Sequence, residues 1–551
     1  MLYHKWSNRV LSLTLIGGVA NLLLATSSWG ETTSGLIGDE GTQQTTPVVS
    51  TVQGTRANVQ RQAVETEGTQ PGYGAFVNSE GLPVEQRSHN LQKQNNSTSL
   101  VQTTSQSQPR TNQLIVPSAD GEIIADIQVR FVDEQGQPTE GTTRPVIITR
   151  EFELQPGDIY RSEQVQQGLQ RVRQLEIVKE ANLSLVPTVA PNQVVMVVNV
   201  VERSSFRVTA FPGSSRAKGF YGVLRLEELN LGGNNQSLAL RLEGGERTLG
   251  FDLSFTSPWI LGDPNRTGYS VGVFNQRSPS NVFIGGDRDV DLPNGETPWV
   301  HRLGGEGEVF RPIAPDWRVG AGLSYERVSV RDDAFTNKVQ PVDELGNQLT
   351  FSDGGQDDLV TVNLSAIQDR RNDDDYPTQG SKLTLGMNQS IPIGDGNILF
   401  NRLSGSYTQY VPVEVFGFSA GSETFVFNLQ GGTTIGDLPP YEAFTLGGGD
   451  SVRGYKSGDV AAGRSFVQAT AEYRFPVFSW LGGAVFADYA TDLGSGDTVP
   501  GEPGEVRDKP GSGFGYGVGV RVRSPLGPVQ VDFGINDQGD NQVHFRLGER
   551  F

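Results

Sequence analysis

The sequence predicts a mainly β protein: an antiparallel transmembrane β-barrel of about 16 strands, preceded by a small α+β domain. Two observations lead to this prediction. From about residue 206 to residue 551, short segments alternate between apolar and polar residues, and turns rich in Gly, Asn, Asp and Pro divide them. Between about 120 and 203, strand-like runs instead flank one helical pattern. Strands of a barrel are short and alternating, so the fold needs no long apolar run.

Residues 1–30 have the layout of a secretory signal peptide. Two basic residues precede an apolar run at 10–24, and small residues follow it. The run is short and is interrupted by glycine and asparagine, so we expect a cleaved signal, with an uncleaved anchor as the alternative. Residues 31–113 are rich in Gln, Thr, Ser and Asn. They contain too little apolar surface to offset the entropy of ordering, which predicts a disordered linker.

A small α+β domain is predicted over 120–203. The segment 124–133 alternates as a strand does. The segment 162–178 repeats apolar residues three and four apart, which predicts a helix with Ser162 as its N-cap. Two further strand-like runs complete the domain.

Residues 206–551 carry the predicted barrel. In the segment 237–243, Leu238, Leu240 and Leu242 share one face, and the opposite face is more polar. The polar faces of such segments are too charged for the core of a β-sandwich. Because lipid cannot satisfy backbone groups, the sheet must close around a polar lumen. About 16 strands fit the length at roughly 9–11 residues each plus turns. A large soluble β protein such as a propeller is the alternative, but the sequence has no blade-length repeat.

The composition argues against several classes of function. The net charge is −19, which gives no sign of the basic surface that nucleic acid attracts. The absence of cysteine excludes thiolate zinc sites and a cysteine nucleophile. The four histidines have no paired spacing, so we do not expect a histidine metal site.

Three segments resemble functional motifs but fail on spacing. The loop 446–459 has no lysine directly after its second key glycine, where a phosphate-binding loop needs it. The sequence GFSAG at 417–421 lies between two strand-like runs and reads as a hairpin, not as a nucleophile elbow. The turn 368–380 lacks the ligand spacing of an EF-hand. We therefore expect no enzyme, no catalytic residue, no metal and no cofactor.

The remaining candidate site is an arginine in the same glycine-rich loop. Arg453 lies between strand-like runs, and Glu472 and Asp488 lie on the polar, lumen-facing sides of the next two strands. If the loop folds into the lumen, the guanidinium can form forked, charge-assisted hydrogen bonds with both carboxylates. That pairing would hold a long loop inside the barrel. The alternative is a solvated loop arginine.

The order and spacing of several segments resemble the Omp85 superfamily of outer-membrane proteins, of the BamA/TamA and surface antigen D15 type. The resemblance covers about 120–551. The sequence VRGY (Val452, Arg453, Gly454 and Tyr455) matches the motif of the sixth extracellular loop in that family. Further matches lie at 471–477, 485–491, 517–535, 229–240, 255–260 and 368–380.

The resemblance implies a 16-stranded barrel preceded by periplasmic POTRA modules, one of which would be 120–203. It implies that Arg453 is the loop-6 arginine and that Glu472 and Asp488 are its partners in the lumen. Phe545, Leu547 and Phe551 are expected on the apolar face of the last strand. Phe551 would be the terminal aromatic residue of this targeting strand.

The resemblance also implies a function without a chemical step. The protein is expected in the cell outer membrane, with its N-terminal region in the periplasm, where it inserts or translocates client proteins. Implied partners are unfolded outer-membrane or secreted clients and outer-membrane lipids, with periplasmic chaperones or accessory subunits as further candidates. POTRA edge strands would bind clients by strand addition, and the seam between 206–211 and 543–551 would open or thin the bilayer.

Two alternatives stay open for the function. One is a two-partner-type secretion transporter for a dedicated client, and the other is a passive pore. The single POTRA-like module also leaves open whether the protein is a main insertase or an accessory paralogue.

Overall fold

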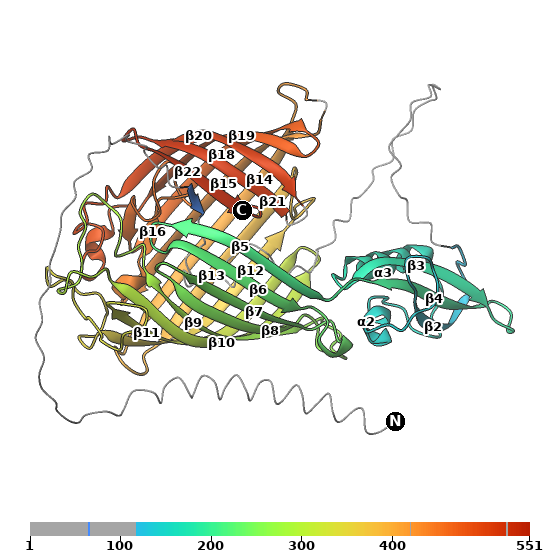
Figure 1. Ribbon diagram of the computed structural model, residues 1–551. Coiled ribbons are helices and arrows are strands. Elements are labelled where there is room, and N and C mark those ends of the chain that lie inside the picture. The colour runs from blue at the N-terminus through green and yellow to red at the C-terminus, as the bar shows by residue number, and fades with distance from the viewer. Residues whose placement is uncertain (1–63, 67–116, 419, 525–526) are drawn as a thin grey trace, which may run out of the picture. The chain divides into compact units, whose positions relative to one another are not determined.

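The computed structural model describes residues 64–66, 117–418, 420–524 and 527–551 (Figure 1). The predicted signal peptide lies outside these ranges. Of the predicted linker 31–113, only the three-residue strand β1 (Val64–Thr66) is described. Within the described ranges, no helix has both the length and the hydropathy that crossing a bilayer requires.

The first domain combines one three-stranded sheet with two helices. The strand order is β2-β4-β3, with β2 parallel and β3 antiparallel to β4. Ile148, Leu169 and Met196 are buried in its core. The short helix α2 was not predicted, because five residues are too few to show a helical period. In chain order the elements are β2 (Ile123–Phe131), α2 (Pro145–Thr149), α3 (Ser162–Gln174), β3 (Val178–Pro187) and β4 (Gln193–Glu202).

The start of α3 differs from the prediction in its cap. Arg161 occupies the N-cap position, and Ser162 is the first residue of the helix. The carboxylate of Asp120 accepts hydrogen bonds from the Ser162 amide at 2.7 Å and from its hydroxyl at 2.6 Å. The free amide at the helix start is therefore satisfied by a residue far away in the sequence, which no local pattern could indicate.

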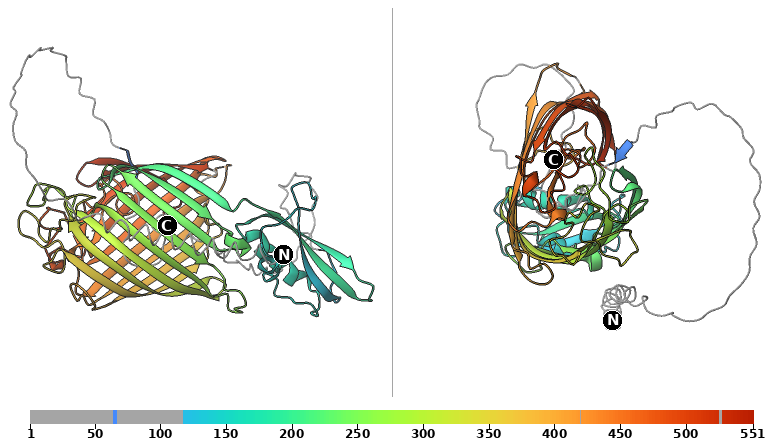
Figure 2. Two further views of the ribbon diagram at one scale, coloured as in Figure 1. Left: turned by 60° about the horizontal axis from the view of Figure 1, so that its bottom comes forward. Right: turned by 90° about the vertical axis from the view of Figure 1, so that its left-hand side faces the viewer.

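Sixteen antiparallel strands form the barrel, so the predicted mainly β class and strand number are confirmed (Figures 1 and 2). They follow one another round the wall in chain order from β5 to β22, and β1 pairs with both β22 and β5. The strands are β5 (Phe206–Ser215), β6 (Gly219–Glu228), β7 (Ser237–Gly245), β8 (Leu249–Ser257), β9 (Gly268–Pro279), β10 (Trp299–Ala314), β11 (Trp317–Arg331), β12 (Gln356–Asp369), β13 (Gly380–Ile391), β14 (Phe400–Val413), β15 (Glu423–Gly436), β18 (Ser465–Phe478), β19 (Leu481–Thr491), β20 (Ser512–Ser524), β21 (Gly527–Asn536) and β22 (Asn541–Leu547).

The strands bury their polar side chains and expose their apolar ones. On β18, Thr470 and Glu472 are buried, whereas the intervening Ala469 and Ala471 are exposed. Because side chains alternate along a strand, one face points into the lumen and the other points outward. In a water-soluble fold, the apolar side chains are the buried ones. The opposite arrangement found here is the pattern from which the barrel was predicted.

The last strand is shorter than predicted. β22 ends at Leu547, and Gly548 has φ +98°, a conformation that ends the extended alternation. Phe545 and Leu547 lie in the strand and pair with Val531 and Val529 of β21. The prediction that Phe551 continues the apolar face of this strand is wrong, because residues 548–551 leave the sheet.

The short strand β1 contacts the junction between the first and last strands of the barrel. It pairs in parallel with Val543–Phe545 of β22. Its residue Thr66 pairs with Ser214 of β5. This segment lies in the predicted disordered linker, where no strand was expected.

Four long connections lie at one end of the barrel. We number them loop 3 (280–298), loop 4 (332–355), loop 6 (437–464) and loop 7 (492–511). Loop 6 contains the short helix η2 (Pro440–Glu442) and a small hairpin of β16 (Phe444–Leu446) and β17 (Ala461–Gly463). The four loops share one apolar cluster, to which each contributes at least one buried side chain: Phe283, Leu349, Tyr441 and Val499.

Two cations of loop 7 attach it to loop 3. Arg507 donates to the carbonyl oxygens of Phe283 at 2.8 Å and Val290 at 3.0 Å. Lys509 donates from Nζ to the carbonyl oxygens of Asn281 at 2.9 Å and Val282 at 3.1 Å. Burial, together with the nearby charge of Arg507, lowers the pKa of Lys509 to about 7.

The depressed pKa of Lys509 predicts that the contact between loops 3 and 7 strengthens as the pH rises above 7. Between pH 7 and the ordinary lysine value of 10.5, the released loop binds more protons than the docked loop, so docking becomes more favourable with rising pH. We expect proteinase K to cleave loop 7 about tenfold more slowly at pH 9 than at pH 7, when rates are normalised to an unfolded substrate. Lys509→Met should abolish this pH dependence, and a slope that survives the substitution would contradict the assignment.

Candidate functional site

Loop 6 enters the lumen because glycines leave room for its backbone. Gly454 has φ +103°, and a Cβ atom at this position would lie 2.7 Å from the backbone nitrogen of Asn536 on β21. A Cβ atom on Gly515 of β20 would lie 1.9 Å from the carbonyl oxygen of Arg453. Larger residues at either position would therefore push the loop away from the wall.

Arg453 is fully buried and bonded to the two carboxylates that the sequence predicted. Its Nε and Nη2 atoms donate to the two oxygens of Asp488 at 2.7 and 3.0 Å, which is the forked arrangement. Its Nη1 atom donates to Glu472 at 2.7 Å. The exposed fraction of the Arg453 side chain is 0%, so the alternative of a solvated arginine is wrong.

The structure adds two wall residues to this arginine site. Asp532 of β21 accepts a hydrogen bond from Nη1 of Arg453 at 3.1 Å. The ring of Phe486 lies with its centroid 3.3 Å from the guanidinium carbon. Asp532 lies on the polar face of an alternating segment, so the sequence could have predicted that its side chain points inward. The sequence could not have predicted its distance from Arg453, because this distance depends on strand register.

Further arginines balance the carboxylates around Arg453. Glu472 also accepts hydrogen bonds from Arg474 at 2.8 Å and Arg521 at 3.0 Å. Arg521 reaches Asp532 at 2.5 Å, and Arg550 reaches Asp488 at 3.3 Å. A buried charge is tolerated only when it is paired, and here each carboxylate has more than one cationic partner.

The other residues of the VRGY motif hold the loop in place on either side of Arg453. Val452 is buried in an apolar cluster with residues of β16, β17 and β19. The amide of Gly454 donates to Nε2 of His544 on β22 at 3.2 Å. The Tyr455 hydroxyl donates to Asp537 at 2.6 Å, and burial together with this carboxylate raises the pKa of Tyr455.

Loop 6 is also bonded to the end of β22 and to the residues that follow it. Arg546 pairs with Asp450, and Arg550 donates to the carbonyl oxygen of Ser451 at 2.9 Å. Glu549 pairs with Arg474 of β18 at 2.7 Å, and the carbonyl oxygen of Phe551 accepts a bond from the Tyr410 hydroxyl at 3.3 Å. These inward contacts explain why Phe551 does not lie on the apolar face of the strand. No pattern in the sequence predicted these contacts.

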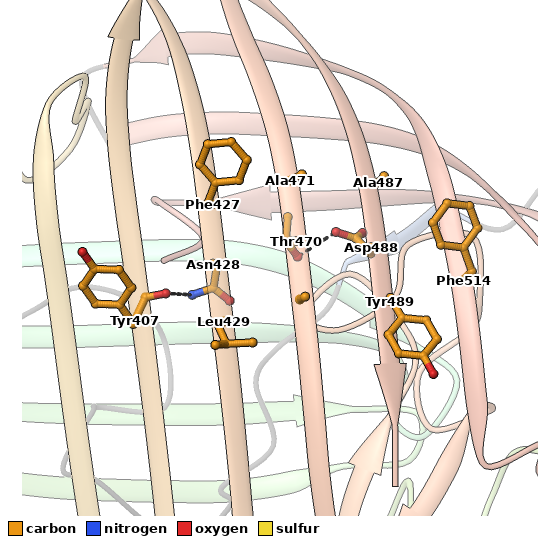
Figure 3. Close-up of a pocket in the computed structure, with 11 residues that line it drawn as sticks. Tyr407, Phe427, Asn428, Leu429, Thr470, Ala471, Ala487, Asp488, Tyr489 and Phe514 are labelled. Carbon is orange, nitrogen blue, oxygen red and sulfur yellow. Dashed lines mark hydrogen bonds between the residues drawn. The ribbon is translucent and has the colours of Figure 1, made fainter. Parts of the chain in front are cut away.

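The outer surface directly behind the arginine site is a shallow groove of about 350 Å³ (Figure 3). Ala469, Ala471 and Ala487 contribute to its lining together with larger aromatic side chains, among them Phe427 and Tyr489. The neighbouring residues on the same strands point the other way, and Thr470 donates to Asp488 at 2.8 Å. The outer lining thus includes three alanines directly behind the strands that bear Glu472 and Asp488.

Comparison with known proteins identifies relatives over most of the chain. The family profile of the Omp85 superfamily domain matches residues 230–551. The chain is similar to chloroplastic outer envelope protein 80 of Arabidopsis thaliana, with 34% identity over 435 residues, and of Oryza sativa subsp. japonica, with 34% over 436. Each alignment covers 78% of this chain, but only 57% and 63% of the relative. The chain therefore spans less than two thirds of the length of these relatives.

Two solved structures share the fold. BamA from Haemophilus ducreyi lacking POTRA domains 1-3 aligns with a TM-score of 0.56 at 16% identity, covering 78% of this chain and 84% of that one. CdiB from Escherichia coli aligns with a TM-score of 0.52 at 13% identity, covering 78% and 76%. At these identities the likeness concerns the architecture of the barrel alone.

Because Arg453 is the shared partner of three buried carboxylates, we expect the Arg453→Ala variant to form a much less stable barrel. The substitution leaves the carboxylates of Asp488, Glu472 and Asp532 buried without their shared partner, which costs about 3 kcal/mol. We expect the folded, fast-migrating band to convert to the unfolded band at a lower temperature in heat-modifiability gels. Lys456→Ala is the matched control, because Lys456 is an exposed cation of the same loop. Equal conversion temperatures for the two variants would contradict a structural role for Arg453.

Proposed function

The chain belongs to the Omp85 superfamily, and from that premise we propose that it inserts or translocates client proteins at an outer membrane. No chemical step is involved. The observation that carries the proposal is the anchoring of loop 6: Arg453 bonds to β18, β19 and β21, and the flanking loop residues bond to β22 and the segment after it.

Loop 6 supports this function because it holds the last strand from inside the barrel. The contacts of His544, Arg546 and Arg550 with the loop use side chains, not the backbone edge of β22. The last strand can therefore change its partner at that edge while it stays attached to the lumen. The contact of β22 with β1 puts a strand other than β5 at this edge. We propose that the seam between β22 and β5 is the place where a client strand enters.

The loops argue against an open channel as the resting form. Loop 6 fills part of the lumen, and the shared apolar cluster joins it to loops 3, 4 and 7 at one end of the barrel. A passive pore would need loop 6 to leave the lumen, at the cost of exposing the cluster that it shares with the other three loops to water. Lateral release at the seam does not need this movement.

We propose that the domain at 120–203 is a POTRA-like module in the periplasm that receives unfolded clients. The strand order β2-β4-β3 makes β2 and β3 the two edge strands of its sheet. An extended client segment can add to an edge strand through main-chain hydrogen bonds, which tolerate varied side chains. The predicted signal peptide at 1–30 and linker at 31–113 are consistent with export to that compartment. Outer-membrane lipids would contact the apolar outer face of the barrel, and periplasmic chaperones or accessory subunits would deliver clients.

Depletion of the protein from its native cell tests the proposed function. We expect quantitative proteomics of the outer membrane to show a broad loss of other barrel proteins. Re-expression of the parent chain or of Lys456→Ala should restore them, whereas Arg453→Ala should not, because it releases loop 6. Loss of a single secreted protein would instead support a transporter dedicated to one client. An unchanged membrane proteome would contradict the assembly function.

A further inference from the structure

Loop 6 carries a second buried ion cluster, centred on Glu442 in η2. The carboxylate accepts hydrogen bonds from Arg302 of β10 at 2.8 Å and from Arg402 of β14 at 3.1 Å. Arg402 also donates to the backbone carbonyl of Glu442 at 2.8 Å. The side chains of Glu442 and Arg402 are 3% and 5% exposed, so this pairing takes place away from bulk water.

Residues beside Glu442 attach to the same side of the barrel. The Tyr441 hydroxyl donates to Asp357 of β12 at 2.8 Å, and its carbonyl oxygen accepts a bond from Arg302 at 3.3 Å. The guanidinium of Arg402 lies 3.9 Å from the centroid of the Phe444 ring. The start of loop 6 is therefore fixed by charge, hydrogen bonds and an aromatic contact together.

The two ion clusters of loop 6 have opposite polarity. At Arg453 a loop cation meets wall carboxylates, whereas at Glu442 a loop carboxylate meets wall arginines. Of the two arginines that bind Glu442, Arg302 lies on β10, nearly opposite β19 in the strand order, whereas Arg402 lies on β14, nearer to β18 and β19. Glu442 precedes the β16–β17 hairpin, and Arg453 lies at its tip.

We propose that Glu442 is a positioning residue that makes loop 6 a strut in the lumen, attached to β10 and β14 through Glu442 and to β18, β19 and β21 through Arg453. Opposite polarity fixes the direction of the loop, since Arg453 would be repelled by Arg302 and Arg402, and Glu442 by Asp488 and its neighbours. Arg453 and its neighbours attach the tip of the hairpin to the barrel wall. The Glu442 pairs add charged attachments at its base, and so set how far the hairpin enters the barrel.

A cysteine reporter in the hairpin tests the strut. The chain has no cysteine, so Ala461→Cys supplies the sole thiol, at a 0% exposed position on β17 that pairs with Leu446 of β16. The readout is the rate of labelling by a membrane-impermeant maleimide on intact cells that produce the full chain. Heat-modifiability gels of the same samples report whether the barrel is folded.

We expect Glu442→Gln, which keeps the shape of the side chain and removes its charge, to raise the labelling rate about tenfold. Glu442→Asp, which keeps the charge, should stay closer to the parent. The double variant Glu442→Gln, Arg453→Ala should raise the labelling rate further than either change alone, because loop 6 then loses both of its ion clusters.

Glu326→Gln is the matched control. Glu326 of β11 also accepts a bond from Arg302, at 3.0 Å, and is equally buried, but it belongs to the wall and not to the loop. Its substitution should leave the labelling rate unchanged. If Glu442→Gln does not give a folded barrel, Arg402→Gln removes the wall partner instead and should raise the rate in the same way.

Two results would overturn the proposal. One is unchanged labelling in folded Glu442→Gln or Arg402→Gln while Arg453→Ala raises the rate. The other is equal labelling in Glu326→Gln and Glu442→Gln, which would show a general effect of the ion cluster on the wall. The labelling rate measures the position of loop 6 and not client insertion. The proposal about Glu442 can therefore be tested independently of the depletion experiment.

Discussion

A guanidinium enclosed by protein must be paired, and in this barrel the pairing of Arg453 joins parts of the chain that are far apart in the sequence. Its carboxylate partners come from β18, β19 and β21, and these in turn bind arginines of β18, β20 and the segment after β22. Leaving any of these charges alone in the lumen would cost several kcal/mol, roughly the scale on which the whole fold is stable. Three features bring the charges together. Loop 6 lies inside the lumen, Gly515 lets the backbone of Arg453 approach β20, and the turn at Gly548 directs Arg550 inward.

The same requirement explains why two kinds of core occur in one chain. The α+β domain is held by apolar residues such as Leu169 and Met196, which are hidden from water in the ordinary way. The barrel exposes its apolar residues on the outside and fills its interior with polar groups, so hydrogen bonds and ion pairs must supply the specificity of its packing. Apolar packing returns where loops 3, 4, 6 and 7 meet at the end of the barrel, and in the cluster around Val452.

Much of the wall could be predicted, since alternation with a period of two is local. It identified the strands and the inward direction of Glu472 and Asp488, and the spacing of VRGY pointed to their partner. What escaped prediction depends on distant residues or on a break in the pattern. Asp532 and His544 approach loop 6 through strand register, Asp120 caps α3 from another segment, and Gly548 removes Phe551 from the phase of β22. Glu442 lies in a loop, where no period indicates which way a side chain points.

The alanines behind the arginine site determine what surrounds its charges. Ala469, Ala471 and Ala487 are short, so hydrocarbon outside the barrel can approach the backbone that bears Thr470, Glu472 and Asp488 more closely than it could past aromatic residues. Ion pairs strengthen as the local dielectric constant falls, because less polarisable surroundings screen them less. The network around Arg453 is therefore insulated on its outer side by the bilayer itself. A detergent micelle that admits water at this groove would weaken the same ion pairs without changing a single residue.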